Sequence, residues 1–179
     1  MSDDGSDGAS DLEANGADEG DGRERFCCDA MCGKLATYLR MCGHDVAYAL
    51  DRGVEADDEL AALARTEDRR LLTRDRELAR RLGAAAVELT ERSVEGQLRE
   101  LAAAGVDLTP ADRPRYCGVC NGLVRRVEAG SEPDHAPDDV AVWRCVDCGQ
   151  AFWRGSHWED VVETLVRVRD TDDQDEEEK

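Results

Sequence analysis

The stretch RLLTRDRELARRLG, residues 70–83, decides the fold. It opens with a short apolar run, passes through Thr73, Arg74 and Asp75, and continues with leucines at helical spacing as far as a glycine. RFCCDAMCGKLATYLRMCG, residues 25–43, repeats this order, with Asp29 standing between the apolar run and an amphipathic segment. Each stretch predicts a buried strand, an acid just beyond its end, and then a helix.

Two further pairs of strand and helix complete the pattern. DVAYAL, residues 45–50, and AAVEL, residues 85–89, are typical of strands, whereas DDELAALARTED, residues 57–68, and SVEGQLRELAAAG, residues 93–105, are typical of amphipathic helices. Strands that alternate with helices favour a parallel sheet with right-handed crossovers. The predicted fold class is therefore an α/β sandwich built on a parallel sheet.

The character of the chain changes after residue 105. VDLTPADRPR, residues 106–115, holds two of the four prolines, and the part that follows combines two CxxC pairs, five of the eight aromatic residues and a closing helix. Both ends of the chain are acidic and poor in apolar residues, which predicts disorder. The expected division is an acidic tail (1–25), an α/β domain (26–105), a linker (106–115), a cysteine-rich module with the C-terminal helix (116–169) and a second acidic tail (170–179).

The formal net charge of −19 is concentrated in these tails, so residues 26–169 carry only −6 and can approach an anionic polymer. Of the 23 basic residues, 21 are arginine. Acid excess with few lysines is typical of halophilic proteins in concentrated salt, and a high-GC genome also favours arginine. No apolar run approaches the roughly 20 residues that span a bilayer. We expect a cytoplasmic protein without membrane contact, and the sequence leaves open whether it forms a homodimer.

Several acids are expected at one edge of the sheet. Asp29 and Asp75 each follow a strand, and Asp57 and Asp58 begin the helix after the second strand. The carboxyl ends of parallel strands meet at the same edge, and carboxylates gathered there repel one another unless a divalent cation neutralises them. Oxygen ligands favour Mg²⁺ or Mn²⁺, which can activate water toward a phosphodiester. The alternative is that each acid only caps its own helix.

The two CxxC pairs, Cys117 with Cys120 and Cys145 with Cys148, are separated by 24 residues. Four thiolates in two such loops predict a closed, tetrahedral and structural Zn²⁺ site. A thiol redox motif is excluded because neither pair stands between a strand and a helix.

Several motifs together resemble a known family. CDAMCGKLATYLRMCGHDV (28–46), DDELAALARTEDRRLLTRDREL (57–78), the two CxxC pairs and FWRGSHW (152–158) are similar to the Mut-seven C-terminal ribonuclease domain, a PIN-like nuclease fused to a zinc ribbon. The resemblance covers roughly residues 25–165. It implies a metal-dependent ribonuclease that acts on RNA, on a PIN-like parallel-sheet sandwich followed by a small zinc ribbon and a C-terminal helix.

The resemblance also implies roles for individual residues. Asp29, Asp57 and Asp75 would hold one or two Mg²⁺ or Mn²⁺ ions, with Asp57 favoured over Asp58, and Thr73 would orient a water or a ligand carboxylate. A fourth acid, found in many PIN-like domains, is either Glu88 or Glu91.

The expected RNA contacts come from basic and aromatic residues. Lys34 and Arg40, on the first helix, are placed to reach a phosphate. Trp153 and Arg154 suit base stacking and phosphate pairing, although packing within the small ribbon explains them as well. The rival to a nuclease is a non-catalytic RNA-binding or adaptor protein on a degenerate PIN scaffold.

Overall fold

A four-stranded parallel sheet forms the centre of the computed structural model, which describes residues 23–128 and 130–176, with side chains as far as Asp170. The strands β1 (Arg25–Cys28), β2 (Asp45–Tyr48), β3 (Arg70–Thr73) and β4 (Ala86–Glu88) lie in the order β2-β1-β3-β4. All pairs are parallel, and the side chains of Phe26, Cys27 and Cys28 are fully buried. Burial on both faces explains why the two central strands, β1 and β3, are largely apolar. The predicted α/β fold class is confirmed.

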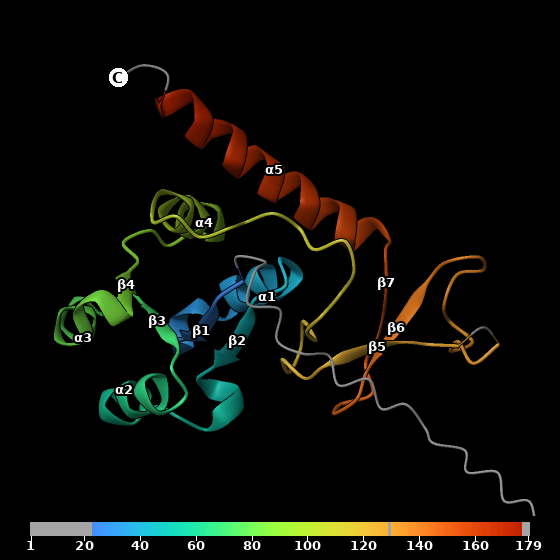
Figure 1. Cartoon of the computed structure of the whole chain (residues 1–179), viewed down its shortest axis with the longest axis horizontal. Coiled ribbons are helices and arrows are strands. Elements are labelled where there is room, and N and C mark those ends of the chain that lie inside the picture. Colours follow the sequence, from blue (N-terminus) through green and yellow to red (C-terminus); the bar gives the residue numbers. More distant parts are fainter. Residues whose placement is uncertain (1–22, 129, 177–179) are drawn as a thin grey trace, which may run out of the picture.

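A helix follows each strand, as Figure 1 shows. They are α1 (Gly33–Met41), α2 (Asp57–Thr66), α3 (Arg76–Leu82) and α4 (Val94–Ala103), with short 3-10 turns at Ala30–Cys32, Leu50–Arg52 and Gly83–Ala85. Two helices begin at side-chain caps, because Ser93 accepts from the backbone N–H of Gly96 and Asp75 from that of Leu78. The helices predicted from periodicity are therefore present.

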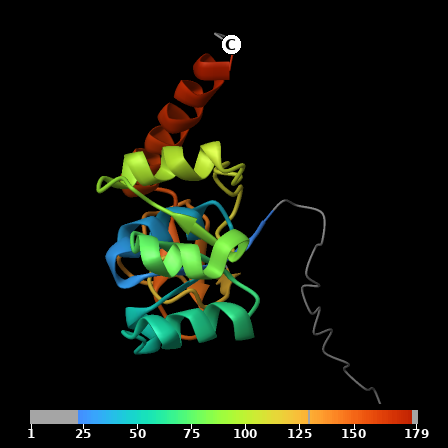
Figure 2. The ribbon, with the colours of Figure 1, turned by 90° about the vertical axis from the view of Figure 1, so that its left-hand side faces the viewer.

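The helices cover both faces of the sheet. On one face α1 and α4 bury Leu35, Leu39, Leu98 and Leu101 against Phe26 of β1. On the other face α2 and α3 pack Leu60, Ala61, Ala64 and Leu78 on Cys27 and Leu71. Figure 2 shows α4 on one side of the sheet and α2 on the other. This three-layer arrangement leaves the carboxyl ends of the strands as the open edge.

The C-terminal helix α5 (Ser156–Glu176) lies along α4 (Figure 1). Val161, Leu165 and Val168 are buried in the same core as β1, and Val106 and Leu108 of the expected linker join them. The chain therefore returns to the α/β core after the cysteine-rich segment. Residues 1–22 and 177–179 of the expected tails lie outside the described residues, and the division into domains stays a prediction.

The cysteine-rich segment forms a second, antiparallel sheet. Its strands β5 (Val124–Arg126), β6 (Val142–Cys145) and β7 (Ala151–Trp153) lie in the order β5-β6-β7. We call residues 116–153 the ribbon. Within the described part of the chain, no helix combines the length and apolar character that crossing a membrane requires.

The ribbon docks on the open side of β2, the edge strand. Asn121 accepts a hydrogen bond from the backbone N–H of Val46 at 2.9 Å and donates to the carboxylate of Asp45 at 2.6 Å. Asn121 has a left-handed backbone (φ 66°), which asparagine tolerates better than most residues. The amide side chain therefore satisfies part of a sheet edge that would otherwise face water.

Candidate active site and metal centre

The open edge of the α/β sheet carries Asp29, Thr73 and Asp75 in one hydrogen-bonded group. Asp29 follows β1 and donates its backbone N–H to the carbonyl of Leu72 at 3.0 Å, which places it level with Thr73. The buried Thr73 donates its hydroxyl to Asp29 Oδ2 at 2.6 Å and accepts from the backbone N–H of Asp75 at 2.9 Å. One threonine thus joins the two acids that follow neighbouring strands.

Asp75 also has a local role. Its Oδ1 accepts from the backbone N–H of Leu78 at 2.8 Å and caps α3, as the capping alternative proposed. The cap uses one carboxylate oxygen and leaves Oδ2 outside that bond. Asp75 therefore combines a structural role with a carboxylate oxygen at the edge of the sheet.

Asp57 and Asp58 begin α2, and both are exposed. Arg81 donates to the Asp58 carboxylate at 2.8 Å and to the backbone carbonyl of Asp57 at 3.1 Å. Asp58 is thus engaged in an ion pair, whereas Arg81 contacts only the backbone carbonyl of Asp57. This difference agrees with the prediction that Asp57, rather than Asp58, is the ligand of Mg²⁺ or Mn²⁺.

The three predicted carboxylates do not form a compact ligand set. Within residues 23–128 and 130–176, only four cysteines place three or more ligand atoms of His, Cys, Asp or Glu within 4.8 Å of one another. Like charges repel, and Asp29, Asp58 and Asp75 each hold a separate local partner. The donor type still suits a hard cation, because every acid at this edge offers oxygen.

The two candidates for a fourth acid differ in position. Glu88 ends β4 directly opposite Thr73 in the β3–β4 register, so it stands in the same row of the sheet. Glu91 lies beyond the strand and packs its side chain over Gly96 at the start of α4. Glu88 is therefore the better placed of the two.

Of the two basic residues on α1, only Lys34 is exposed. Arg40 is buried, with 3% of its surface accessible, and donates to the carbonyls of Val46 (2.8 and 3.0 Å), Gly118 (3.1 Å) and Val119 (3.1 Å). The phosphate contact expected of Arg40 is therefore wrong. The reason is that Arg40 lies next to a sheet edge and a loop whose backbone carbonyls need donors. By binding them, Arg40 joins α1 to the first CxxC loop.

Trp153 and Arg154 lie where β7 leads into α5. The ring of Trp153 meets that of His135 edge-on at 5.7 Å and is partly exposed. Arg154 donates to the backbone carbonyl of Asp112 and lies over the ring of Trp158 at 5.3 Å. Packing therefore accounts for part of each side chain, and both retain exposed surface.

The four ribbon cysteines converge from two loops. Their sulfur atoms lie within 4.8 Å of one another, with Cys117 and Cys148 3.6 Å apart and Cys120 and Cys145 3.5 Å apart. Tetrahedral zinc with Zn–S bonds of about 2.3 Å separates its sulfurs by roughly 3.8 Å. The four cysteines could therefore hold a metal ion, and their number and spacing fit a closed thiolate shell.

The protein shifts the pKa values of these cysteines in opposite directions. Burial raises the pKa of Cys117 to about 12. Burial acts in the same direction on Cys145, but hydrogen bonds from the backbone N–H groups of Cys148 and Asp147 outweigh it and lower its pKa to about 7. Gly122 is required nearby, because a Cβ there would lie 2.9 Å from the sulfur of Cys145. Only a cation would keep all four sulfurs deprotonated together.

Sequence reasoning missed two residues at these sites, Arg74 and Asn121. Arg74 lies between Thr73 and Asp75, and its Nε is buried without a hydrogen-bond partner. Its position inside the threonine–aspartate element was the signal that could have identified it. Asn121 directly follows Cys120, but nothing in the sequence indicates that it pairs with β2.

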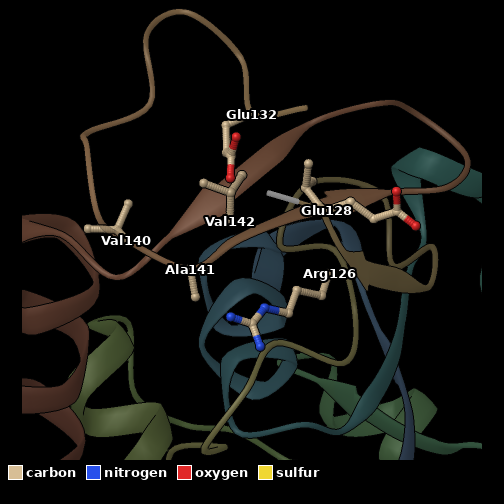
Figure 3. Close-up of a pocket in the computed structure, with 7 residues that line it drawn as sticks. Arg126, Glu128, Glu132, Val140, Ala141 and Val142 are labelled. Carbon is tan, nitrogen blue, oxygen red and sulfur yellow. The ribbon is translucent and has the colours of Figure 1, made fainter. Parts of the chain in front are cut away.

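A hollow of about 340 Å³ lies within the ribbon (Figure 3). Arg126, Glu128 and Glu132 line it together with Val140, Ala141 and Val142. Figure 3 shows the side chains of Arg126 and Glu128 extending away from each other, so its charged groups do not converge on a common point. We therefore assign no ligand to this hollow.

Comparison with known proteins agrees with these motifs. The model of the Mut7-C RNAse domain matches residues 24–165, which include β1 and the edge acids, both CxxC loops and the first half of α5. No significant match was found among curated proteins or among solved structures. The predicted resemblance is confirmed, and the chain belongs to the Mut7-C RNAse domain family.

Proposed function

We propose that this protein is a metal-dependent ribonuclease whose centre is the group formed by Asp29, Thr73 and Asp75. The observation that carries the proposal is the position of Thr73, whose hydroxyl binds the carboxylate of Asp29 and the backbone of Asp75 at the open edge of the sheet. Membership of a ribonuclease domain family supports the reaction class. The proposed reaction is hydrolysis of an RNA phosphodiester.

Each residue of the centre has a separate task. Asp29 and Asp75 would supply the oxygen ligands, with Asp57 joining from the start of α2 and Glu88 from the end of β4. Thr73, by donating to Oδ2 of Asp29, fixes the orientation of that carboxylate. Lys34, exposed on α1, would contact the phosphate. When bound, Mg²⁺ or Mn²⁺ supplies the positive charge that polarises the phosphodiester and lowers the pKa of the attacking water.

The ribbon would hold one structural Zn²⁺ and help to bind the RNA strand. Arg125 and Arg144 stand directly opposite each other on β5 and β6, and both are exposed. Like charges in directly opposite positions destabilise a sheet, and an anion between them removes that cost. Trp153 projects from the same face by the strand alternation, which adds a ring for base stacking.

The test is cleavage of a labelled single-stranded RNA by the zinc-loaded protein, with and without Mn²⁺, in high KCl because of the acidic composition. We expect cleavage only with Mn²⁺, and the Asp29→Asn variant should lose roughly 100-fold or more of the rate. Asp58→Asn is the matched control, since its side chain is 90% exposed and outside the proposed centre. Cleavage by Asp29→Asn at the rate of the control would refute the assigned centre.

One observation favours the rival function. The acids at the sheet edge are not gathered into a ligand set of three, as expected of a scaffold that binds RNA without cutting it. RNA binding without any Mn²⁺-dependent cleavage would establish that non-catalytic reading in place of ours.

A further inference from the structure

Arg74 is a charged residue at the open edge of the sheet, and among the described residues it has no ion-pair partner. It lies in the turn between β3 and α3, where Thr73 and Asp75 on either side are hydrogen-bonded to each other. Its Nε is buried and has no hydrogen-bond partner, and within the described residues its guanidinium forms no ion pair. A guanidinium keeps its charge at any physiological pH and carries five N–H donors. The buried Nε–H is left unsatisfied, which is unfavourable, whereas the side chain as a whole is partly exposed.

The acids nearby do not use this charge. Asp29 and Arg74 both act on the buried thiol of Cys32, whose pKa burial raises to about 11, with Asp29 raising it further and Arg74 lowering it. Both charged groups therefore lie near Cys32. Yet Asp29 is bonded to Thr73, and Asp75 is bonded to the backbone of Leu78.

Two other arginines, Arg69 and Arg40, differ from Arg74 because their guanidinium groups have partners within the protein. Arg69 binds the carboxylates of Asp45 and Glu67, and Arg40 binds backbone carbonyls. These guanidiniums are saturated by the protein itself. Of these three arginines, only Arg74 has no ion-pair or hydrogen-bond partner among the described residues.

We propose that Arg74 binds a phosphate group of the RNA strand at the Asp29–Thr73–Asp75 edge. A phosphodiester presents two non-bridging oxygens, which match the paired donors of a guanidinium. Its negative charge also explains why an arginine lies among acids without pairing to them: RNA that approaches carboxylates needs a positive group beside them. This inference rests on the proposed function and names a substrate contact within it.

A purely structural role for Arg74 has a different signature. If its aliphatic stem only covers Cys32, then Arg74→Met keeps the packing and leaves RNA binding unchanged. Arg74→Lys keeps the charge and removes the fork. Arg76→Met is the matched control, because Arg76 is the exposed first residue of α3, two positions away.

The experiment measures binding of a fluorescent single-stranded RNA in the Asp29→Asn background, so that cleavage cannot interfere, across a series of KCl concentrations. We expect Arg74→Met to weaken binding roughly tenfold, as for loss of one hydrogen bond to a charged group. The slope of log K against log salt should fall by about 0.7, the value for one phosphate contact on a single strand. Arg74→Lys should retain the slope and lose part of the affinity, and Arg76→Met should change neither.

The inference is overturned if Arg74→Met binds RNA with the same affinity and the same salt slope as Arg76→Met. It is also overturned if the parent protein, in the Asp29→Asn background, does not bind RNA. Thermal unfolding of each variant identifies a folding defect. If Arg74→Met is misfolded, the RNA affinity and salt slope of Arg74→Lys decide whether the inference holds. Failure of the proposed function is distinguishable. If Arg74 controls binding while Asp29→Asn cleaves normally, the catalytic centre is wrong and the phosphate contact stands.

Discussion

The cysteine cluster of the ribbon and the acidic edge of the α/β sheet gather ligands in opposite ways. The cysteines come from two loops 24 residues apart, yet their sulfurs lie 3.5–3.6 Å apart in pairs. The acids follow adjacent strands, yet they touch only through Thr73 and do not form a set of three. Neither a short separation in sequence nor adjacent strands therefore determined which ligand side chains come close together.

The difference follows from charge and solvation. Protonated cysteine is a small, weakly polar side chain that packs in a buried turn without a counter-ion. A carboxylate at the protein surface is ionised, hydrated and repelled by neighbouring carboxylates. Each one is therefore held by a local donor: Thr73, Arg81 or a backbone N–H at the start of α3. The described part of the chain thus contains one assembled cysteine site, whereas the acids at the sheet edge stay apart, and the cation that would gather them belongs to our proposal.

The largest effect is expected from dismantling the cysteine site. Replacing Cys117 and Cys145 together with Ser should abolish zinc binding and unfold the ribbon, because apparent zinc affinities of such sites amount to about 10–16 kcal/mol. The α/β sheet should remain folded. Metal content per chain and circular dichroism are the measurements.

Cys42→Ala is the control for this pair. Cys42 is a fully buried cysteine of the core on the α1 side of the sheet, outside the cluster. The Cys42→Ala substitution should lower the stability of the protein without reducing its zinc content. Zinc retained by the double Ser variant would show that the thiolates are not the ligands.

A smaller effect is expected at the contact between the two regions. Arg40→Met leaves the carbonyls of Val46, Gly118 and Val119 without its donors. Since each unsatisfied buried acceptor costs about 1–3 kcal/mol, the free energy of unfolding should fall by about 3 kcal/mol. Urea unfolding measures the change, and limited proteolysis should show faster cutting in the ribbon.

Arg65→Met provides the comparison, because Arg65 is an exposed arginine near the end of α2. It should change stability little. An Arg40→Met variant as stable and as resistant to protease as Arg65→Met would mean that Arg40 does not join the ribbon to α1.

The sequence predicted the fold well because apolar runs and helical spacing are local signals. It placed Asp29 just beyond a strand, Asp75 before a helix, and all four cysteines in one cluster. It failed where the outcome depends on tertiary partners. Nothing local in α5 indicates that Val161 and Leu165 pack beside α4.

Individual polar residues were the hardest to predict. Arg40 was expected to meet a phosphate, but its guanidinium found the carbonyls of a loop nearly 80 residues away. The expected gathering of Asp29, Asp57 and Asp75 assumed that a shared sheet edge is enough, whereas the carboxylates of Asp29 and Asp75 are each held by a local hydrogen bond. Periodicity carries no information on such long-range hydrogen bonds.

The most direct test of the central claim is a calorimetric titration of Mn²⁺ into the zinc-loaded, full-length protein. Our account predicts that Mn²⁺ binds the parent protein and Asp58→Asn alike, and that Asp29→Asn and Asp75→Asn each lose most of the binding. Equal Mn²⁺ binding by Asp29→Asn and by the parent protein would contradict the account.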